Sequence, residues 1–398
     1  MNEEYILKIL GRETRFLDND YINVENSIKK IINNSNILVL GGAGSIGSKV
    51  VKELFRYDPK LLHVVDINEN DLVELVRDIR SSLGYINGEF ETFAIDIGSK
   101  QFEALIKEHK NYDIWLNFSA LKHVRSEKDP FTLMRLIEVN IINTFKTLEL
   151  ATKTNAKVYF SVSTDKAANP VNFMGASKRA MELILGAYSK EINVCSARFG
   201  NVAFSNGSLL RGMINRFDSK QPLVAPKDIK RFFLTPLEAA QLSIISFIFS
   251  RSGEVYIPLI NGQDIERNFP EIVNNFLQEK GFKMYITDSE KSARSEVLKL
   301  IVNKNWPCYI FETDTTGEKL EEVFISDKEE LNQLQFSNIG STNLNNIKNK
   351  NEVLSLIDSF INLQKNKKWS IDDIKHILQN FIENFNHKAT GKYLEKRM

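Results

Sequence analysis

The chain has 398 residues, of which 42% are hydrophobic and 26% are charged. These proportions are close to those of ordinary globular proteins, which excludes a disordered or fibrous chain. Single hydrophobic cores stop growing at roughly 250–300 residues, so the chain is long enough for one large or two modest domains, and a lone small module is excluded. Lys and Arg number 52 against 51 Asp and Glu, a net charge of +1. This balance leaves no overall field that would hold nucleic acid or an anionic membrane.

Cysteine usage and the longest apolar run point to a reducing, aqueous compartment. The only two cysteines, Cys195 and Cys308, cannot form a disulfide scaffold, and neither has the Cys/His spacing of a zinc site, so we predict no metal. The first residues lack a basic segment followed by an apolar run. The longest apolar stretch, Leu242–Phe249, is far shorter than the roughly 20 residues of a membrane span. We expect a soluble, unprocessed, cytoplasmic protein with no membrane partner.

Short strand-like runs alternate with helical patterns from residue 36 to residue 197, which is typical of repeated βαβ units and a parallel sheet. The predicted strands are Ile37–Leu40, Leu62–Val65, Glu91–Ile95, Ile114–Phe118, Val158–Val162 and Val194–Ala197. The predicted helices between them are Lys49–Arg56, Leu72–Leu83, Phe102–Lys110, Phe131–Lys153 and Ser177–Tyr188. We therefore predict an α/β fold with a doubly wound parallel sheet of the Rossmann type, which binds ligands at the carboxyl ends of its strands.

The rest of the chain divides into a smaller part and two additions. Residues 198–230 and 262–341 are irregular and are assigned to a substrate-binding part. Residues 231–261, with a helix at Leu237–Phe249 and a strand at Val255–Leu259, are assigned to the same domain as residues 36–197. Residues 1–35 form a predicted helical extension, in which Tyr5, Ile6, Ile9 and Leu10 share one face.

Residues 342–398 are predicted to form an Asn- and Lys-rich linker and a helical hairpin. Ser370 with Asp373 three residues later predicts a helix start, and Gly391 predicts its end. The apolar stripes of the hairpin are Val353, Leu354, Ile357, Phe360 and Ile361, then Ile374, Ile377, Leu378, Phe381, Ile382 and Phe385. Since large apolar patches commonly mark interfaces, they predict internal packing or contact within a homo-oligomer, a dimer or larger.

A glycine-rich run, Gly41 to Gly47, follows the first predicted strand and precedes a helix, which is the context of a phosphate site. Gly41 would allow the tight turn, Gly44 would let backbone N–H groups approach a pyrophosphate, and Gly47 would let helix and strand pack closely. The positive end of the helix would add a favourable field. The alternative is a glycine-rich turn without a ligand.

Two acidic residues follow the next strands. Asp66 stands nineteen residues after Gly47, where a carboxylate would accept hydrogen bonds from an adenosine ribose. The following residues, 67–70, include no Arg or Lys to neutralise a 2′-phosphate, which favours NAD over NADP as the cofactor. Asp96 is placed either to meet the adenine amino group or to act as a helix N-cap.

The predicted strand Val158–Val162 runs into Ser163, Thr164, Asp165 and Lys166, so a hydroxyl, an acid and a base arrive together at the carboxyl end of a central strand. Lys178 follows twelve residues after Lys166. The alternative interpretation of this segment is a solvated turn with an ion pair.

With these motifs the chain resembles the extended short-chain dehydrogenase/reductases, and within them the nucleotide-sugar 4,6-dehydratases that act on N-acetylglucosamine nucleotides in bacterial surface-glycan pathways. The resemblance covers Asn36 to about Phe324. It rests on Gly41–Gly47, Leu121–Val124, Asn140, Ser163–Ala167, Asn169–Asn172, Met174–Lys178, Arg198–Val202, Arg231–Phe233 and Gly317–Lys319.

One position departs from the superfamily pattern. Met174 stands where the tyrosine of Tyr-x-x-x-Lys belongs, although Lys178 is kept. A subgroup of the resembled dehydratases has methionine here and keeps Thr-Asp-Lys, so the resemblance still implies an active enzyme in which Met174 shapes the pocket.

The resemblance implies a role for each of these residues. Lys166 would take the proton on sugar carbon 5, and Asp165 would protonate the leaving hydroxyl on carbon 6. Thr164 would hydrogen-bond the oxygen on carbon 4, and Lys178 would hold the nicotinamide ribose. The expected reaction is NAD-dependent loss of water from an NDP-N-acetylglucosamine, with UDP favoured and GDP open, to give the 4-keto-6-deoxy sugar nucleotide.

Other residues are implied more weakly. Ser45, Ile46 and Ala120 would contact the cofactor. Asn201 and Arg231 would bind the substrate diphosphate, for which an Arg is well suited. Glu318 and Lys319 would lie near the nucleotide. Lys122 and His123 would face the same crevice, where a lone histidine is as often structural.

Two rival functions remain. A 4-epimerase of the same nucleotide sugar uses the same fold, but it needs no Asp165–Lys166 pair and normally uses tyrosine. A non-catalytic NAD-binding sensor or scaffold is suggested by Met174 and by the helical ends.

Overall fold

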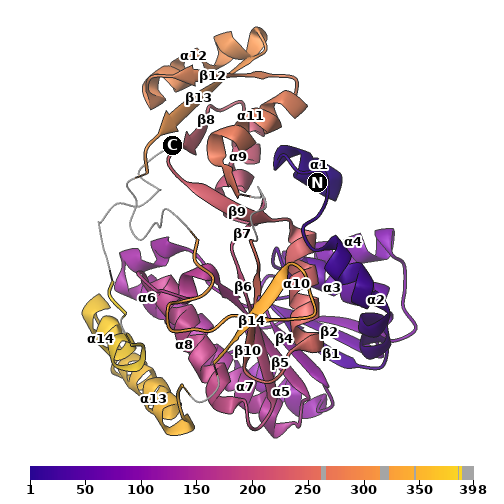
Figure 1. Ribbon diagram of the computed structural model, residues 1–398. Helices are drawn as coiled ribbons and strands as arrows, with labels where there is room; N and C mark the ends of the chain where they lie inside the picture. The colour runs from indigo at the N-terminus through magenta and orange to yellow at the C-terminus, as the bar shows by residue number, and fades with distance from the viewer. Residues whose placement is uncertain (261–265, 314–321, 345–346, 384, 388–398) are drawn as a thin grey trace.

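The computed structural model describes residues 1–260, 266–313, 322–344, 347–383 and 385–387, and a nine-stranded sheet dominates it (Figure 1). In spatial order the strands are β14 (Asn332–Gln333), β15 (Ile339–Asn343), β10 (Glu254–Pro258), β6 (Asn193–Phe199), β5 (Val158–Thr164), β4 (Ile114–Asn117), β1 (Asn36–Leu40), β2 (Leu61–Asp66) and β3 (Glu89–Ala94).

The direction and order of these strands confirm the predicted fold class. The seven strands from β3 to β10 are parallel, while β15 and β14 are antiparallel additions at one edge. The order reverses between β1 and β4, which is the switch point of a doubly wound sheet and the place where such folds bind ligands.

Helices cover both faces of the sheet because successive strand residues point to opposite sides. On β1, Ile37 and Val39 belong to one core cluster, and Leu38 and Leu40 belong to the other. The first face is covered by α2 (Asp18–Asn33), α3 (Gly47–Arg56), α4 (Glu69–Ser82) and α10 (Pro236–Phe249). The second is covered by α5 (Lys100–Glu108), α6 (Pro130–Ile137), α7 (Asn143–Lys153), α8 (Phe173–Tyr188), α13 (Lys350–Asn366) and α14 (Ile371–Phe381).

The helix predicted over Phe131–Lys153 is interrupted. A π-helical turn, Glu138–Ile142, separates α6 from α7. Asn140 lies in this turn, where it accepts a hydrogen bond from the Leu121 N–H and donates to the Leu121 carbonyl and to Ser177. The wider turn thus serves to hold the loop after β4, as π-helical turns often do near functional sites.

A smaller part lies beyond the carboxyl ends of the central strands, at the top of Figure 1. It contains two three-stranded sheets and a third core cluster. The sheets are β11 (Glu266–Asn268), β9 (Lys230–Leu234) and β7 (Asn201–Val202), and β12 (Lys283–Thr287), β13 (Asn305–Phe311) and β8 (Leu223–Pro226). The helices are α9 (Leu209–Asp218), α11 (Phe269–Glu279), α12 (Glu290–Val302) and α1 (Glu3–Ile9).

Two segments lie elsewhere than the predicted division placed them. Residues 332–341 were assigned to the smaller part, yet β14 and β15 extend the large sheet, with β15 antiparallel to β10. Only Ile339 is apolar in Ile339–Asn343, so hydrophobic pattern could not reveal that strand. Residues 231–234 were assigned to the large domain, yet β9 pairs with β11 and β7 of the smaller part.

The N-terminal extension packs on both parts of the molecule. Ile6, Ile9 and Leu10 are buried in the third core cluster, while Ile28 and Ile32 of α2 join the first. Between the two helices, Arg12 forms an almost fully buried ion pair with Glu238 at the start of α10.

The C-terminal hairpin packs against α8 and α6, and buried residues of both its helices join the second core cluster (Figure 1). Ser370 caps α14 together with Asp373, as predicted. The predicted stripe is wrong at one position, because Leu354 is 45% exposed while Leu356 is buried. Since the stripes are covered within the chain, they do not require a second subunit, and the homo-oligomer stays a prediction.

The end of α14 was also predicted wrongly. The helix ends at Phe381, and the buried residues Ile382 and Phe385 beyond it are not helical. Gly391, the predicted end, lies outside the described residues. In the part of the chain that the structure describes, no helix combines the length and the apolar character that crossing a membrane requires.

The packing of the hairpin can be tested with a pair of substitutions in α13. Phe360 is fully buried, so Phe360→Ala should lower the free energy of unfolding by about 3 kcal/mol. Leu354→Ala on the exposed face of the same helix should change it by less than about 1 kcal/mol. Urea unfolding measures both, and equal effects would mean that α13 does not pack as described.

Candidate active site

A cavity of about 440 Å³ opens at the switch point, between the glycine-rich turn, the ends of β4 and β5, the start of α8 and the loop after β7. Most of the predicted site residues line it. They are Gly41, Gly44, Ser45, Ile46, Gly47, Ala120, Lys122, His123, Thr164, Lys166, Met174, Lys178 and Asn201.

The glycine-rich turn is built for close backbone approach. Gly41 has a φ of +70°, and a Cβ added to it would lie 2.5 Å from the Ser119 nitrogen. A Cβ at Gly47 would lie 2.3 Å from the Gly41 carbonyl oxygen. At Gly44 the nearest atom would be 3.4 Å away, so that position leaves room on its cavity side. With α3 starting at Gly47 and carrying no side-chain cap, the turn fits a pyrophosphate at a helix N-terminus.

Asp66 lies directly beside this turn. Its carboxylate accepts hydrogen bonds from the backbone N–H groups of Ala43 and Asn68, both at 3.0 Å. Each carboxylate oxygen has two lone pairs, so Asp66 holds the turn and keeps capacity to accept a further hydrogen bond. On the opposite side, Ser45 accepts a hydrogen bond from the Asn206 N–H at 2.8 Å, which closes the loop after β7 over the turn.

Asp96 has local partners. Its carboxylate accepts a hydrogen bond from the Gly98 N–H at 2.8 Å and contacts Arg135 at 3.1 Å. The N-cap of α5 is Ser99, so the alternative role of Asp96 as that cap is wrong. Asp96 and Asp66 both lie outside the lining of the 440 Å³ cavity.

The end of β5 holds a hydroxyl, a carboxylate and an ammonium in direct contact. Thr164 donates to Asp165 at 2.7 Å, and the Lys166 Nζ lies 3.1 and 3.3 Å from the two Asp165 oxygens. The side chain of Asp165 is only 3% exposed, whereas that of Lys166 is 30% exposed and lines the cavity. The short 3-10 turn Asp165–Ala167 produces this arrangement. The buried carboxylate excludes a merely solvated turn.

Lys178 and Met174 enter the cavity from α8. The Lys178 ammonium donates to the Val162 carbonyl at 2.8 Å. Burial lowers the pKa of Lys178 to about 7, although the nearby Glu182 charge opposes this shift. The backbone N–H of Met174 donates to Glu127 at 3.1 Å, and Glu127 contacts His387 at 3.0 Å. Through Glu127, His387 of the C-terminal segment is thus linked to the first turn of α8, where Met174 lies.

Lys122 and His123 face the loop after β7. The Lys122 ammonium donates to Ser205 at 3.1 Å, and burial lowers its pKa. Burial also lowers the pKa of His123, and the charges of Lys122 and Arg125 add to this shift. The Gly207 backbone lies so near that a Cβ there would be 2.7 Å from the His123 ring. Because the His123 ring is tightly packed and its lowered pKa favours the neutral imidazole, we infer that His123 shapes the cavity wall.

The remaining substrate-binding predictions have different outcomes. Asn201 lines the cavity and donates to Glu322 at 2.9 Å. Arg231 is buried on β9, donates to the Lys230 carbonyl and lies outside the lining of this cavity. Glu318 and Lys319 lie outside the described residues. The sequence analysis did not single out Glu322, which contacts Asn201. The one signal that could have found it was its position four residues after Glu318, inside the region that resembles the family.

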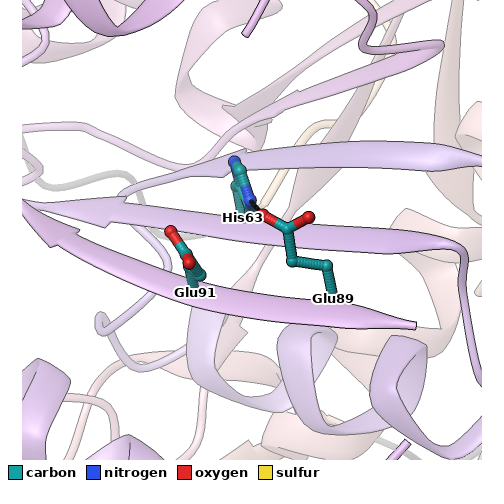
Figure 2. Close-up of side chains that lie close together, drawn as sticks. All are labelled: His63, Glu89 and Glu91. Atoms are coloured by element: carbon teal, nitrogen blue, oxygen red, sulfur yellow. Dashed lines mark hydrogen bonds and ion pairs between the residues drawn. The ribbon is translucent and has the colours of Figure 1, made fainter. Parts of the chain in front are cut away.

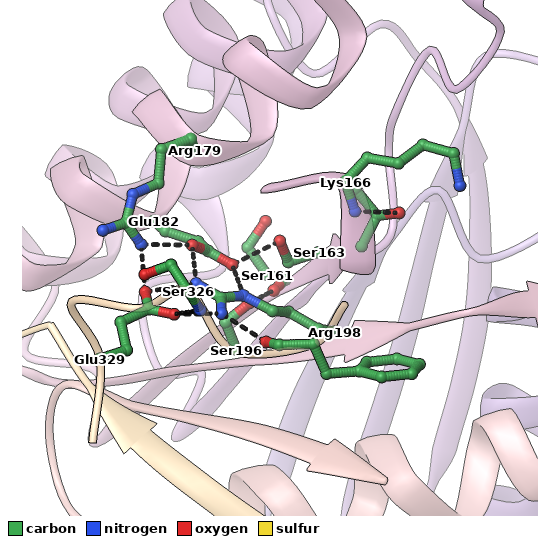
Figure 3. Close-up of polar contacts among 11 residues, drawn as sticks. Ser161, Ser163, Lys166, Arg179, Glu182, Ser196, Arg198, Ser326 and Glu329 are labelled. Atoms are coloured by element: carbon green, nitrogen blue, oxygen red, sulfur yellow. Dashed lines mark hydrogen bonds and ion pairs between the residues drawn. The ribbon is translucent and has the colours of Figure 1, made fainter. Parts of the chain in front are cut away.

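A buried ionic cluster lies next to the end of β5, where Ser163 contacts it (Figure 3). Arg198 on β6 pairs with Glu182 of α8 and with Glu329, both at 2.7 Å, and Arg179 contacts the same two carboxylates. Ser163 donates to Glu182 at 2.7 Å. Although burial opposes it, the Arg198 and Arg179 guanidinium groups lower the pKa of Glu329 to about 2.

A second polar group lies far from the cavity, on β2 and β3 (Figure 2). His63, Glu89 and Glu91 have potential metal-ligating atoms within 4.8 Å of one another. However, His63 already contacts Tyr112 at 2.7 Å and Glu89 at 2.8 Å, and burial lowers the pKa of His63. Both glutamates are exposed. These contacts account for the group as a neutral histidine held by hydrogen bonds.

The strand order, the glycine-rich turn and the cavity at the switch point define a Rossmann-type nucleotide-binding protein. Residues 37–344 match the family described as "Polysaccharide biosynthesis protein", and the chain belongs to this family.

Three curated relatives are similar in sequence to part of this chain. A Methanocaldococcus jannaschii protein named as an uncharacterized membrane protein is 30% identical over 64% of this chain and 76% of its own. The capsular polysaccharide biosynthesis protein CapD of Staphylococcus aureus is 30% identical over 63% of this chain, but only 41% of CapD is matched. The inverting UDP-N-acetylglucosamine 4,6-dehydratase of Campylobacter jejuni is 27% identical over 59% of this chain and 70% of the enzyme.

Solved structures share the fold. Pen from Bacillus thuringiensis superposes with a TM-score of 0.64, at 22% identity over 80% of this chain and 90% of Pen. UDP-N-acetylglucosamine 4-epimerase from Methanobrevibacter ruminantium has a TM-score of 0.54, at 18% identity over 74% and 90%. The dTDP-glucose 4,6-dehydratase DesIV of Streptomyces venezuelae, solved with NAD, has a TM-score of 0.52, at 19% identity over 70% and 88%. At these identities the likeness concerns the fold alone.

The position of Asp66 predicts a cofactor preference. Because its carboxylate can accept from a ribose hydroxyl but would repel a 2′-phosphate, NAD⁺ should bind more tightly than NADP⁺ in calorimetry. Asp66→Ala should weaken NAD⁺ binding at least about tenfold, partly by releasing the Ala43 N–H. Tighter binding of NADP⁺ by the unaltered protein would contradict this assignment.

Proposed function

We propose that this protein is an NAD-dependent 4,6-dehydratase of an NDP-N-acetylglucosamine, with UDP as the favoured carrier, acting in the synthesis of a bacterial surface polysaccharide. The contact among Thr164, Asp165 and Lys166 carries this proposal, because the buried Asp165 carboxylate contacts Thr164 and Lys166, whose side chains line the cavity of the glycine-rich turn. Membership of the polysaccharide biosynthesis family and similarity to a UDP-N-acetylglucosamine 4,6-dehydratase support it.

The residues around the glycine-rich turn fit NAD. The open side of Gly44 and the uncapped start of α3 would take the pyrophosphate, Asp66 the adenosine ribose and Lys178 the nicotinamide ribose. When bound there, NAD⁺ would supply the redox chemistry of the reaction, which is hydride transfer from sugar carbon 4 and back to carbon 6. The cofactor is therefore unchanged overall, and the net reaction is loss of water.

The side chains at the end of β5 would move the protons. Thr164 donates to Asp165, so Asp165 can take the proton of the carbon-4 hydroxyl through Thr164 as the ketone forms. Lys166, in its neutral form, takes the proton from carbon 5, which the ketone has made acidic. Asp165 then passes its proton to the departing carbon-6 hydroxyl, which leaves as water. Lys166 returns a proton to carbon 5, so each group ends as it began.

An epimerase is the second candidate, since a nucleotide-sugar 4-epimerase shares the fold. Met174 argues against it, because a thioether cannot exchange the proton that the tyrosine normally exchanges. The Asp165–Lys166 pair would also have no task in an epimerase. A silent NAD-binding scaffold would likewise leave that pair without a use.

Product analysis separates these functions. Purified protein with NAD⁺ and UDP-N-acetylglucosamine, or the GDP sugar in parallel, should yield a product lighter by one water in mass spectrometry. A product of unchanged mass but altered sugar stereochemistry would support the epimerase. NAD⁺ binding without turnover of either sugar would support the scaffold.

Substitutions at the end of β5 should separate the steps. Lys166→Ala should still oxidise carbon 4 but stall before water leaves, so reduced nicotinamide absorbance should accumulate. Asp165→Asn and Lys166→Ala should each lower turnover by roughly 10²–10⁴-fold while substrate binding changes little. Met174→Ala should have a milder effect. Near-normal dehydration by Lys166→Ala, with activity abolished in Met174→Ala, would contradict the assigned roles.

A further inference from the structure

Glu127 connects two elements of the cavity wall. It lies in the 3-10 turn Val124–Lys128, which directly follows the cavity residues Lys122 and His123. One oxygen of its carboxylate accepts a hydrogen bond from the Met174 N–H, in the first turn of α8, at 3.1 Å. The first N–H groups of a helix have no partner inside the helix, so Glu127 satisfies one of them, and its charge is favourable at the positive end of α8. The loop after β4 and the start of α8 are thereby joined.

His387 contacts the second oxygen of the same carboxylate. The His387 Nε2 atom lies 3.0 Å from the Glu127 Oε2 atom. The Glu127 side chain is 1% exposed and that of His387 is 11% exposed, so water has little access to the contact. Because an ionised carboxylate can only accept hydrogen bonds, His387 acts here as the donor. A buried carboxylate that loses such a donor is costly to keep in place, so its position depends on His387.

Aromatic contacts fix the position of His387. Its imidazole packs on the ring of Phe173, with 4.4 Å between the centroids, and the Phe385 ring contacts Phe173 at 5.7 Å. Phe173 is the first residue of α8 and is fully buried. Between the helices of the hairpin, Trp369 donates to the Pro130 carbonyl at 2.8 Å, where α6 begins. The C-terminal part of the chain therefore packs against the N-terminal ends of both α6 and α8.

This support comes from outside the family match. The match ends at residue 344, whereas His387 follows the C-terminal hairpin. Glu127 and Met174 lie inside the match, so a segment beyond it holds residues of the site itself. Lys178 follows Met174 by four residues, which places both on one face of α8, and both line the cavity.

We propose that His387 is a positioning residue for the active site. Through Glu127 it holds the first turn of α8, with Met174 and Lys178, against the loop after β4. The width of the cavity that would take NAD⁺ then depends on a hydrogen-bond donor from the C-terminal segment. The effect on turnover rests on the proposed function, whereas the effect on NAD⁺ binding does not.

Two substitutions separate the hydrogen bond from the ring contact. His387→Phe keeps a ring against Phe173 but cannot donate to Glu127, whereas His387→Gln loses the ring and keeps an N–H donor. His387→Phe should weaken NAD⁺ binding roughly three- to tenfold in calorimetry, the effect of one lost or displaced hydrogen bond. His387→Gln should bind NAD⁺ within about twofold of the unaltered protein.

Turnover at saturating NAD⁺ gives a second readout. In His387→Phe, kcat should fall roughly ten- to a hundredfold, because a small misplacement of reacting groups is costly. KM for UDP-N-acetylglucosamine should change less than about threefold. His387→Gln should restore kcat to within about threefold of the unaltered value.

A double substitution tests the route through Glu127. In a Glu127→Ala background, His387→Phe should cause no further loss of NAD⁺ affinity or of kcat, because the group on which it acts is already absent. An equal loss in both backgrounds would mean that His387 acts by another route and would overturn the proposal. If Glu127→Ala does not fold, the comparison of His387→Phe with His387→Gln decides alone.

His376→Ala is the matched control, because His376 is an exposed histidine of α14, and this variant should behave as the unaltered protein. Equal effects of His387→Phe and His387→Gln, or a change in melting temperature alone, would contradict the proposal. If the unaltered protein binds NAD⁺ but dehydrates neither UDP- nor GDP-N-acetylglucosamine, the proposed function fails, and the NAD⁺ affinities still decide the role of His387.

Discussion

The arrangement of the site depends on one buried ionic cluster, in which Arg198 lies between Glu182 and Glu329 with no exposed surface. A buried charge that loses its partner costs several kcal/mol, so α8, β6 and residues 324–329 must come together for any of these charges to be tolerated. Glu182 of this cluster also accepts a hydrogen bond from the hydroxyl of Ser163, near the carboxyl end of β5. It thereby fixes the strand end that carries Thr164, Asp165 and Lys166.

The groups suited to binding a cofactor and the groups suited to proton transfer lie on different elements around the cavity. The glycine-rich turn and Asp66 offer backbone and carboxylate groups suited to a dinucleotide, while the end of β5 offers groups that exchange protons. Met174 contributes neither, and it is held by Glu127 and, through Glu127, by His387 near the C-terminus. Under the proposed function, a thioether at this position leaves proton transfer to Asp165 and Lys166, which contact each other at the end of β5.

Local patterns sufficed for the parallel strands, for the glycine-rich turn and for the contact between Asp165 and Lys166, because these residues are neighbours in sequence. They could not reveal β15, whose residues are mostly polar and whose partner, β10, lies some eighty residues earlier. Nor could they place Glu322 beside Asn201, or Glu329 beside Arg198, since these pairs are separated by 121 and 131 residues. The prediction that Leu354 lies on the buried face of the hairpin was wrong, because helical spacing alone does not tell which side of a helix packs against α8.

Solvent deuterium tests the central claim most directly, because the proposed reaction breaks and remakes the bond between carbon 5 and hydrogen at Lys166. The reaction with UDP-N-acetylglucosamine should be run in D₂O and the product analysed by mass spectrometry and NMR. The account predicts a product that has lost one water and carries one deuterium at carbon 5. A sugar nucleotide of unchanged composition without deuterium at carbon 5, formed by this protein, would contradict it.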